Sequence, residues 1–407
     1  MNVSQKAPKQ EQKGYNGSYM DRARVPFWQR LLPIPLEAWP AEGRLLLALI
    51  SFWSFAGLLV LGSASWWVAN REMGDGAYYI KRQLIWLIAS WSLLHLVIST
   101  NLKSWLRIAG PSLFVALILL VATHFVGITI NGSTRWLVIG PIQIQPSELI
   151  KPFLILQASN LFAKCNRLNT DQKGFWLIIF GSLLLLILSQ PNLSTAALIG
   201  ILLWLIALAA GIKFRSLFGI AFLGGLLGAA SIFFKEYQRL RIISFLDPWS
   251  DPQGSGYQLV QSLLAIGSGG LFGEGYGLST QKLHYLPFRS TDFIFSVFAE
   301  EFGFFGSVML LLFLMLIAFL GLRVALRCQS NELKLIAIGS STILVGQSLM
   351  NIAVASGVMP TTGLPLPMIS YGGSSLLSSL LIAGLLIRCS IESTEIIGAS
   401  KINKRVR

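Results

Sequence analysis

The chain has 407 residues, of which 54% are hydrophobic and 12% are charged, and its formal net charge is +14. Apolar runs of about twenty residues recur along it, the length that crosses a bilayer, and a water-soluble core does not need them. The composition therefore excludes an ordinary soluble enzyme and predicts a polytopic membrane protein. Its basic excess does not require nucleic acid, because Lys and Arg of membrane proteins gather on the cytoplasmic side.

Ten apolar runs predict ten transmembrane helices. With the N-terminus inside, the cytoplasmic segments hold 22 Lys and Arg residues and the outer segments hold 9, so both termini are expected in the cytoplasm. The expected fold is an all-α polytopic membrane protein with a domain at 45–388 and a large extracytoplasmic loop at about 235–291, between the seventh and eighth helices. The runs lie near 45–67, 84–100, 108–127, 146–163, 175–190, 194–211, 214–234, 292–322, 334–356 and 368–388.

The two ends of the chain are expected to be cytoplasmic tails. Residues 1–44 are hydrophilic and contain no short apolar core with a cleavage site, which predicts a disordered tail followed by an uncleaved first span. Residues 389–407 form a basic tail. The three cysteines are scattered without metal-ligand spacing, so structural disulfides are not expected.

The outer loop is rich in Gly and aromatic residues, unlike a solvated linker. Its apolar positions, from Leu259 to Ile266, predict a short amphipathic helix at the membrane face. Motifs of soluble enzymes such as HExxH, GxSxG and the P-loop are absent, and the glycines at 267–277 do not fit GxGxxG. His95, His124 and His284 lie far apart, so no metal triad is predicted.

Asp292 is the first candidate for a catalytic residue. It opens a long apolar run, and an ionisable group at membrane depth usually faces a polar cavity or a partner. Asp292 could act as a lone general base at the outer boundary, or it could cap the helix that follows. Glu300 and Glu301 lie deeper, are not expected to pair with Asp292 on a regular helix, and could hydrogen-bond within the bundle.

Two further clusters of polar residues are candidates for lining a cavity. Arg135 could be a phosphate fork, whereas Glu148 and Lys151 lie on one helical face and could form either an internal ion pair or part of an anion site. The segment 363–375 has prolines, adjacent glycines and serines, which permit either a broken helix lining a polar space or close helix packing. Gln190 could face the same cavity or only cap a turn.

Several longer motifs lie along the chain, namely Asn131-Gly-x-x-Arg-Trp, Gln145-Pro-Ser-Glu-x-x-Lys151, Gln190-Pro-Asn-Leu-Ser-Thr, Phe245-Leu-Asp-Pro-Trp, Gly256-Tyr-Gln-Leu-Val-Gln-Ser, Thr291-Asp-Phe-Ile-Phe and Ile369-Ser-Tyr-Gly-Gly-Ser-Ser. At these motifs the chain resembles the SEDS family, the polytopic glycosyltransferases of bacterial shape, elongation, division and sporulation. The likeness extends from the first span to the last, and residues 254–262 and 281–287 are more similar to the division member than to the elongation member.

The resemblance implies a peptidoglycan glycosyltransferase that polymerises lipid II into glycan strands at the outer face of the bacterial cytoplasmic membrane. Asp292 matches the essential aspartate of the family and would be the base in an inverting transfer. A divalent cation, Mg or Mn, could accompany the lipid diphosphate, and no protein metal site is expected. The residues expected to bind substrate are Arg135, Glu148, Lys151, Gln190, Arg239, Arg241, Lys282, Glu300, Ser370 and Tyr371.

The implied partners are lipid II, the growing strand, a class B penicillin-binding transpeptidase, other divisome proteins and membrane lipid, with no nucleic acid, and the implied location is the division septum. The chain departs from many relatives at Phe288, Ser290 and Thr362, which concerns the electrostatics of the site. Two other functions remain open, a lipid II flippase and a non-catalytic division scaffold. The lack of a visible repeat and the outer position of the candidate groups favour the enzyme over the flippase.

Overall fold

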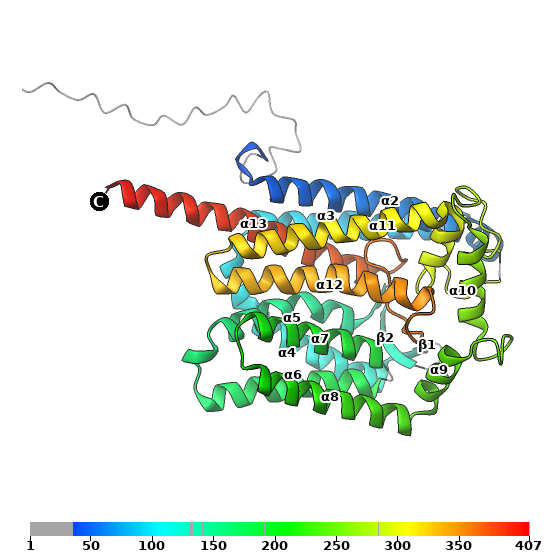
Figure 1. The fold of residues 1–407 in the computed structure, drawn as a ribbon, viewed down its shortest axis with the longest axis horizontal. Coiled ribbons are helices and arrows are strands. Elements are labelled where there is room, and N and C mark those ends of the chain that lie inside the picture. The colour runs from blue at the N-terminus through cyan, green and yellow to red at the C-terminus, as the bar shows by residue number, and fades with distance from the viewer. Residues whose placement is uncertain (1–35, 131–132, 141, 191, 284, 407) are drawn as a thin grey trace, which may run out of the picture. The chain divides into compact units, whose positions relative to one another are not determined.

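The computed structural model describes residues 36–406 except 131–132, 141, 191 and 284. The chain divides into two units, Met1–Ala38 and Trp39–Arg407. In the first, the described part is the 3-10 helix η2, Leu36–Ala38, and most of the predicted N-terminal tail lies outside the described residues. All other elements belong to the second unit (Figure 1).

The described part of the second unit contains ten long helices, and each overlaps one predicted apolar run. Eight of them are long and apolar enough to cross a membrane. The other two are α5, which contains buried Glu148 and Lys151, and α7, which has only 17 residues. The predicted all-α polytopic fold is confirmed. The helices are α2 (Ala41–Met73), α3 (Tyr78–Ser99), α4 (Leu102–Val126), α5 (Pro146–Ala163), α6 (Thr170–Ser189), α7 (Leu193–Ala209), α8 (Phe214–Phe234), α11 (Ile294–Arg327), α12 (Asn331–Ala355) and α13 (Gly373–Val406).

The core lies around α12 and α13. Of the most apolar window of α13, 94% is buried, and this helix packs against α2, α3, α5, α11 and α12. By contrast, the described side chains of α8 include one that is buried, Leu217, as expected for a helix that faces lipid. The helix α13 continues to Val406 without a break at the expected start of the C-terminal tail. A second short 3-10 helix, η3 (Cys165–Arg167), connects α5 to α6.

Three short antiparallel strands between α4 and α5 were not predicted. They are β1 (Ile128–Ile130), β2 (Ser133–Ile139) and β3 (Ile142–Ile144), in the order β1-β2-β3. Their Ile, Val and Thr residues favour an extended chain, but each run is too short to be distinguished from a loop by its pattern. Arg135 is a residue of β2, which lies at one end of the long helices (Figure 1).

The described part of the outer loop contains two helices, α9 (Glu236–Leu246) and α10 (Tyr257–Ser268). The predicted amphipathic helix is confirmed as α10, whose Leu259 and Val260 are buried. Figure 1 shows α9, α10, β1 and β2 at the same end of the long helices. This end also receives the connection from α12 to α13, because ten sequential helices alternate in direction.

The helix α11 is broken at Gly303, where the backbone has φ 66° and ψ −163°. The loop segment 270–275 bonds to the backbone groups that the break frees. Glu274 and Gly275 donate to the carbonyls of residues 300 and 301, while residues 304 and 305 donate to the carbonyls of 270 and 271. A Cβ at Gly303 would lie 2.3 Å from the Gly273 nitrogen, so both the positive φ and the close approach require glycine. The break therefore fixes the outer loop to α11.

Candidate functional site

A cavity of about 540 Å³ lies at the end of the second unit that carries the outer loop. Seven sequence-distant segments line it, so no single motif forms the site. Its lining residues come from α3 (Arg82, Trp86), β2 (Arg135, Trp136), the β3 segment (Gln143, Gln145), α9 (Tyr237, Leu240, Arg241, Ser244), the segment around α10 (Gly254, Ser255, Gln258), the turn before α11 (Phe288, Thr291, Asp292) and the stretch that leads into and begins α13 (Thr361, Gly363, Tyr371, Gly372, Gly373).

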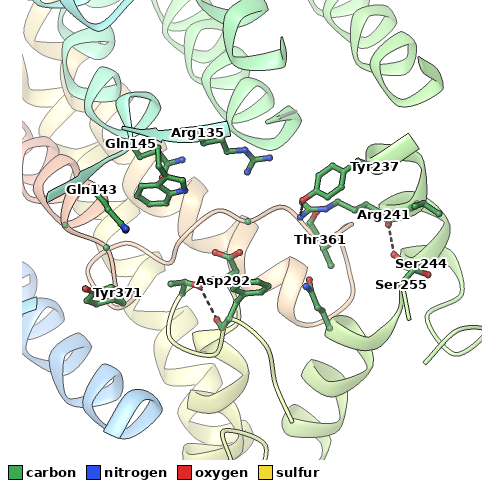
Figure 2. Close-up of a pocket in the computed structure, with 18 of the residues that line it drawn as sticks. Arg135, Gln143, Gln145, Tyr237, Arg241, Ser244, Ser255, Asp292, Thr361 and Tyr371 are labelled. Atoms are coloured by element: carbon green, nitrogen blue, oxygen red, sulfur yellow. Dashed lines mark hydrogen bonds between the residues drawn. The ribbon is translucent and has the colours of Figure 1, made fainter. Parts of the chain in front are cut away.

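Asp292 lies in the turn before α11, and Figure 2 shows its carboxylate pointing into the cavity. The helix begins at Ile294 and Phe293 is the N-cap residue, so the alternative in which Asp292 caps α11 is wrong. In this turn, the Phe288 carbonyl accepts hydrogen bonds from the backbone N–H groups of Thr291 and Phe293. Phe288 itself has φ 53°, a left-handed conformation that costs a non-glycine residue of the order of 1–3 kcal/mol. The surrounding structure therefore imposes the turn that presents Asp292.

Two guanidinium groups of the cavity wall influence the charge of the Asp292 carboxylate. Burial raises the pKa of Asp292 above its ordinary value, and the positive charges of Arg241 and Arg135 oppose that rise. Burial also lowers the pKa of Arg135 to about 10, which leaves the guanidinium charged at neutral pH. The cavity thus holds a carboxylate that remains accessible to protons next to two fixed positive charges.

Both arginines are oriented by neighbours. The Arg241 guanidinium donates to the Thr361 carbonyl at 2.9 Å, bonds the Tyr237 hydroxyl and stacks 4.5 Å from the Tyr237 ring centroid. The Arg135 Nε donates to the Gln190 carbonyl at 3.4 Å. Because an oriented guanidinium loses little freedom on binding, it suits a bidentate anion such as phosphate.

The Tyr371 side of the cavity holds a third arginine, Arg82, which the sequence analysis did not single out. Arg82 donates to the Tyr78 hydroxyl at 3.0 Å. The rings of Tyr79 and Tyr371 meet edge to face with centroids 4.9 Å apart. Burial raises the pKa of Tyr371, which therefore stays a neutral hydroxyl at physiological pH. The only available signal was that Arg82 belongs to the outer basic residues just before the second apolar run.

Four of the predicted site residues line the cavity together, namely Asp292, Arg135, Arg241 and Tyr371. Two others do not line the cavity but hydrogen-bond to residues that do. The Gln190 carbonyl accepts from Arg135, and the Ser370 Oγ donates to the Thr291 carbonyl at 2.5 Å. The remaining five do not line it, and their substrate-binding roles stay predictions. They are Glu148, Lys151, Arg239, Lys282 and Glu300.

Glu300 and Glu301 are buried and hydrogen-bonded within the protein, as one of the two sequence interpretations expected. The Glu300 carboxylate accepts from the Ser279 hydroxyl and from the backbone N–H groups of Thr280 and Gln281. Lys282 donates to Glu301 at 2.6 Å and to the Ser63 hydroxyl at 2.9 Å. These side chains attach the outer loop to α11 and α2, and none of them is among the residues that line the cavity.

A resident metal does not fit the described cavity wall. Asp292 is the one carboxylate among its described lining residues, and no group of three His, Cys, Asp or Glu side chains gathers anywhere in the described parts of the chain. The predicted Asn131 and His284 lie outside the described residues. The residues missed by the sequence analysis, such as Arg82 and Thr361, meet Asp292 only through the tertiary fold.

Fold and site together define a polytopic helical membrane protein with a polar, arginine-flanked carboxylate in a cavity at one end of its bundle. The family model FTSW_RODA_SPOVE, described as cell cycle protein, matches residues 43–395. The chain therefore belongs to the FtsW/RodA/SpoVE family, and the resemblance inferred from its motifs is confirmed.

Named relatives and solved structures agree with this family. A Synechocystis protein named "Probable peptidoglycan glycosyltransferase FtsW" is 49% identical over 358 residues, which cover 88% of this chain and 91% of the relative. A structure described as a peptidoglycan synthase complex that coordinates polymerization and crosslinking has a TM-score of 0.71 and 30% identity, covering 86% of this chain and 97% of that one. The Thermus thermophilus rod shape determining protein RodA has a TM-score of 0.62 and 29% identity, covering 85% and 95%.

Proposed function

We propose that this chain is a peptidoglycan glycosyltransferase that polymerises lipid II, with Asp292 as the general base. The observation that carries the proposal is the Asp292 carboxylate in a cavity that Arg135 and Arg241 also line (Figure 2). Homologues at nearly half identity bear the name of that activity, and the geometry supplies a chemical reason for it.

In the proposed step, Asp292 takes the proton from the 4-hydroxyl of the acceptor sugar as that oxygen attacks the anomeric carbon of the donor. A new carbon–oxygen bond forms on the opposite side from the bond that breaks, so the configuration inverts. The leaving diphosphate keeps the electron pair of the broken bond. Arg135 and Arg241 would stabilise its growing negative charge, the general role of fixed cations at a developing anion.

A raised pKa suits this role. A general base works best when its pKa approaches the working pH while the group remains largely ionised. Burial moves the pKa of Asp292 upward, and the positive charges of Arg241 and Arg135 oppose that shift, so the carboxylate is a stronger base than an exposed Asp. One lining carboxylate among the described residues matches a single displacement, which requires one base and no carboxylate nucleophile.

We place the cavity on the outer face of the cytoplasmic membrane, with both termini in the cytoplasm. The connections at the cavity end belong to the outer segments that hold 9 Lys and Arg residues, against 22 in the inner segments. A septal location follows from the stronger likeness to the division member and is part of the same proposal.

The chain is proposed to work with a transpeptidase of the penicillin-binding class that crosslinks the strands it makes. Support comes from the similar structure described as coordinating polymerization and crosslinking in one complex.

The residues at which the chain departs from the family pattern lie beside the site. Phe288 lines the cavity and Thr362 lines a neighbouring apolar cavity of about 160 Å³. Arg82 and Arg241 line the larger cavity and supply positive charge to it.

Purified full-length protein with its transpeptidase, given labelled lipid II in detergent, tests the proposal. The enzyme makes long glycan strands without a second compartment. A flippase makes no polymer but moves labelled lipid II across vesicles, and a scaffold does neither. Absence of polymer from folded wild-type protein with its partner present would overturn the proposed activity.

A further inference from the structure

The turn that carries Asp292 is held through three consecutive backbone carbonyls. The Ser290 carbonyl accepts from the Tyr371 backbone N–H at 2.8 Å, and the Thr291 carbonyl accepts from the Ser370 hydroxyl at 2.5 Å. The Asp292 carbonyl accepts from the Asn351 amide at 2.7 Å. Three successive anchors leave the turn little freedom to rotate, so the direction of the carboxylate depends on where these anchors lie.

Asn351 is a fully buried residue of α12 that joins two segments of the site. Its Nδ2 group donates to the Asp292 carbonyl and also to the Leu364 carbonyl at 2.8 Å. Both hydrogens of one amide are therefore used, and they fix the turn before α11 to the segment that leads into α13. Gly363 of this segment lines the cavity, so both joined segments belong to its wall.

Gln347, one helical turn earlier on α12, holds the same segment from a second point. Its Nε2 donates to the Pro365 carbonyl at 2.9 Å, and its Oε1 accepts from the Lys151 ammonium at 2.8 Å. An ammonium only donates and a carbonyl only accepts, so these two partners determine which way the amide points. Lys151 is held in turn by Glu148 at 2.5 Å, and all three side chains are about 1% exposed.

We propose that Glu148, Lys151, Gln347 and Asn351 form a positioning relay that sets the geometry of the Asp292 turn from within the bundle. None of the four lines the cavity, so Lys151 acts through Gln347 and not by touching substrate. The relay gives the Glu148–Lys151 pair a role that differs from the substrate binding expected from the sequence. The proposal rests on Asp292 being the base of the proposed function.

Steady-state polymerisation of lipid II by the full-length protein with its transpeptidase tests the relay. Asn351→Ala, Gln347→Leu and Lys151→Met are expected to lower kcat by about 10- to 100-fold with KM changed by less than about twofold, because a small misplacement of a catalytic group reduces chemistry more than binding. Ser348→Ala is the matched control. Ser348 is equally buried on α12 but donates only to the Leu344 carbonyl of its own helix, so wild-type rates are expected.

A double-variant comparison separates the relay from direct substrate contact. Lys151→Met combined with Gln347→Leu is expected to lose no more activity than the worse single variant, since both interrupt one chain of contacts. Losses that multiply, or a raised KM with unchanged kcat in Lys151→Met, would overturn the relay. If a truncating variant does not fold, Gln347→Glu replaces it, because a carboxylate still accepts from Lys151 but cannot donate to Pro365.

Hydrogen exchange provides a readout that does not depend on activity. Backbone amides of the peptide 286–295 are expected to exchange faster in Asn351→Ala and Gln347→Glu than in wild type, and unchanged in Ser348→Ala. Equal exchange in all four proteins would refute the relay even where polymerisation is intact. If exchange is faster in Asn351→Ala and Gln347→Glu but the wild-type protein makes no polymer, the result contradicts the proposed function and supports the relay.

Discussion

Asp292 and Glu301 lie in the same stretch of chain, yet the fold uses their carboxylates in opposite ways. Glu301 is buried and paired with Lys282 and the Ser63 hydroxyl, which attaches the outer loop to the helices. Asp292 points into a cavity that is also lined by Arg135 and Arg241, whose positive charges act on its carboxylate. A carboxylate held by buried donors stabilises the structure, whereas one facing a cavity can exchange a proton with substrate.

The largest expected effect is a loss of stability when Glu301 loses its buried partner. Lys282→Met leaves the Glu301 carboxylate buried without its ion-pair partner, a change that typically costs about 3–5 kcal/mol of unfolding free energy. We expect a clearly lowered thermal unfolding midpoint of the purified protein in detergent.

Lys81→Ala provides the comparison for this experiment. It removes an exposed pair with Asp75 at the same end of the bundle, and no measurable change in the midpoint is expected. If Lys282→Met melts at the wild-type temperature, the Lys282–Glu301 pair does not hold the outer loop. That result would favour the substrate-binding role predicted for Lys282.

An intermediate effect is expected on the catalytic side. Arg241→Gln removes the charge proposed to stabilise the leaving diphosphate, and kcat for lipid II polymerisation should fall about 100- to 1,000-fold, as for other lost transition-state donors. Arg239→Gln, on the same helix α9, alters an exposed arginine outside the cavity lining, and we expect kcat near wild type, against the substrate-binding role that the sequence predicted for Arg239. Equal losses in the two variants would show that α9 contributes a diffuse positive field, not one oriented group.

The smallest expected effect is a shift in pH dependence. Asp292 must be deprotonated to act, so activity falls as the pH drops through its pKa, and burial places that fall above the range of an exposed Asp. Arg241 opposes the upward shift, so in Arg241→Gln the pKa of Asp292 should rise and the acidic limb of kcat/KM should move to higher pH. An unmoved or lowered limb would mean that the limb belongs to another group.

The sequence predicted the long helices well because a run of apolar residues must cross hydrocarbon as a helix whatever its neighbours are. Local boundaries were harder. The eighth run predicts a start at residue 292, but α11 begins at Ile294 because the turn from Phe288 to Phe293 is imposed by tertiary hydrogen bonds. The three strands between α4 and α5 escaped notice for a similar reason, since their short runs gain order from pairing with each other.

The sequence predicted the main charged residues of the site but not which distant segments meet there. Asp292 was identified because a charge near a bilayer is costly and stands out. Arg135 was identified as a phosphate fork, and Arg241 through the family resemblance. Arg82 and Asn351 were missed because their importance arises from contacts between distant segments. For Lys151, sequence spacing supported the pair with Glu148, whereas its second partner, Gln347, is visible only in the fold.

The central claim, that Asp292 accepts the proton of the attacking sugar, is tested most directly by Asp292→Asn. The amide keeps the shape of the side chain but cannot accept that proton, so the purified variant with its transpeptidase should make no labelled glycan strands while melting at the wild-type temperature. Strand synthesis by folded Asp292→Asn at the wild-type rate would contradict the claim.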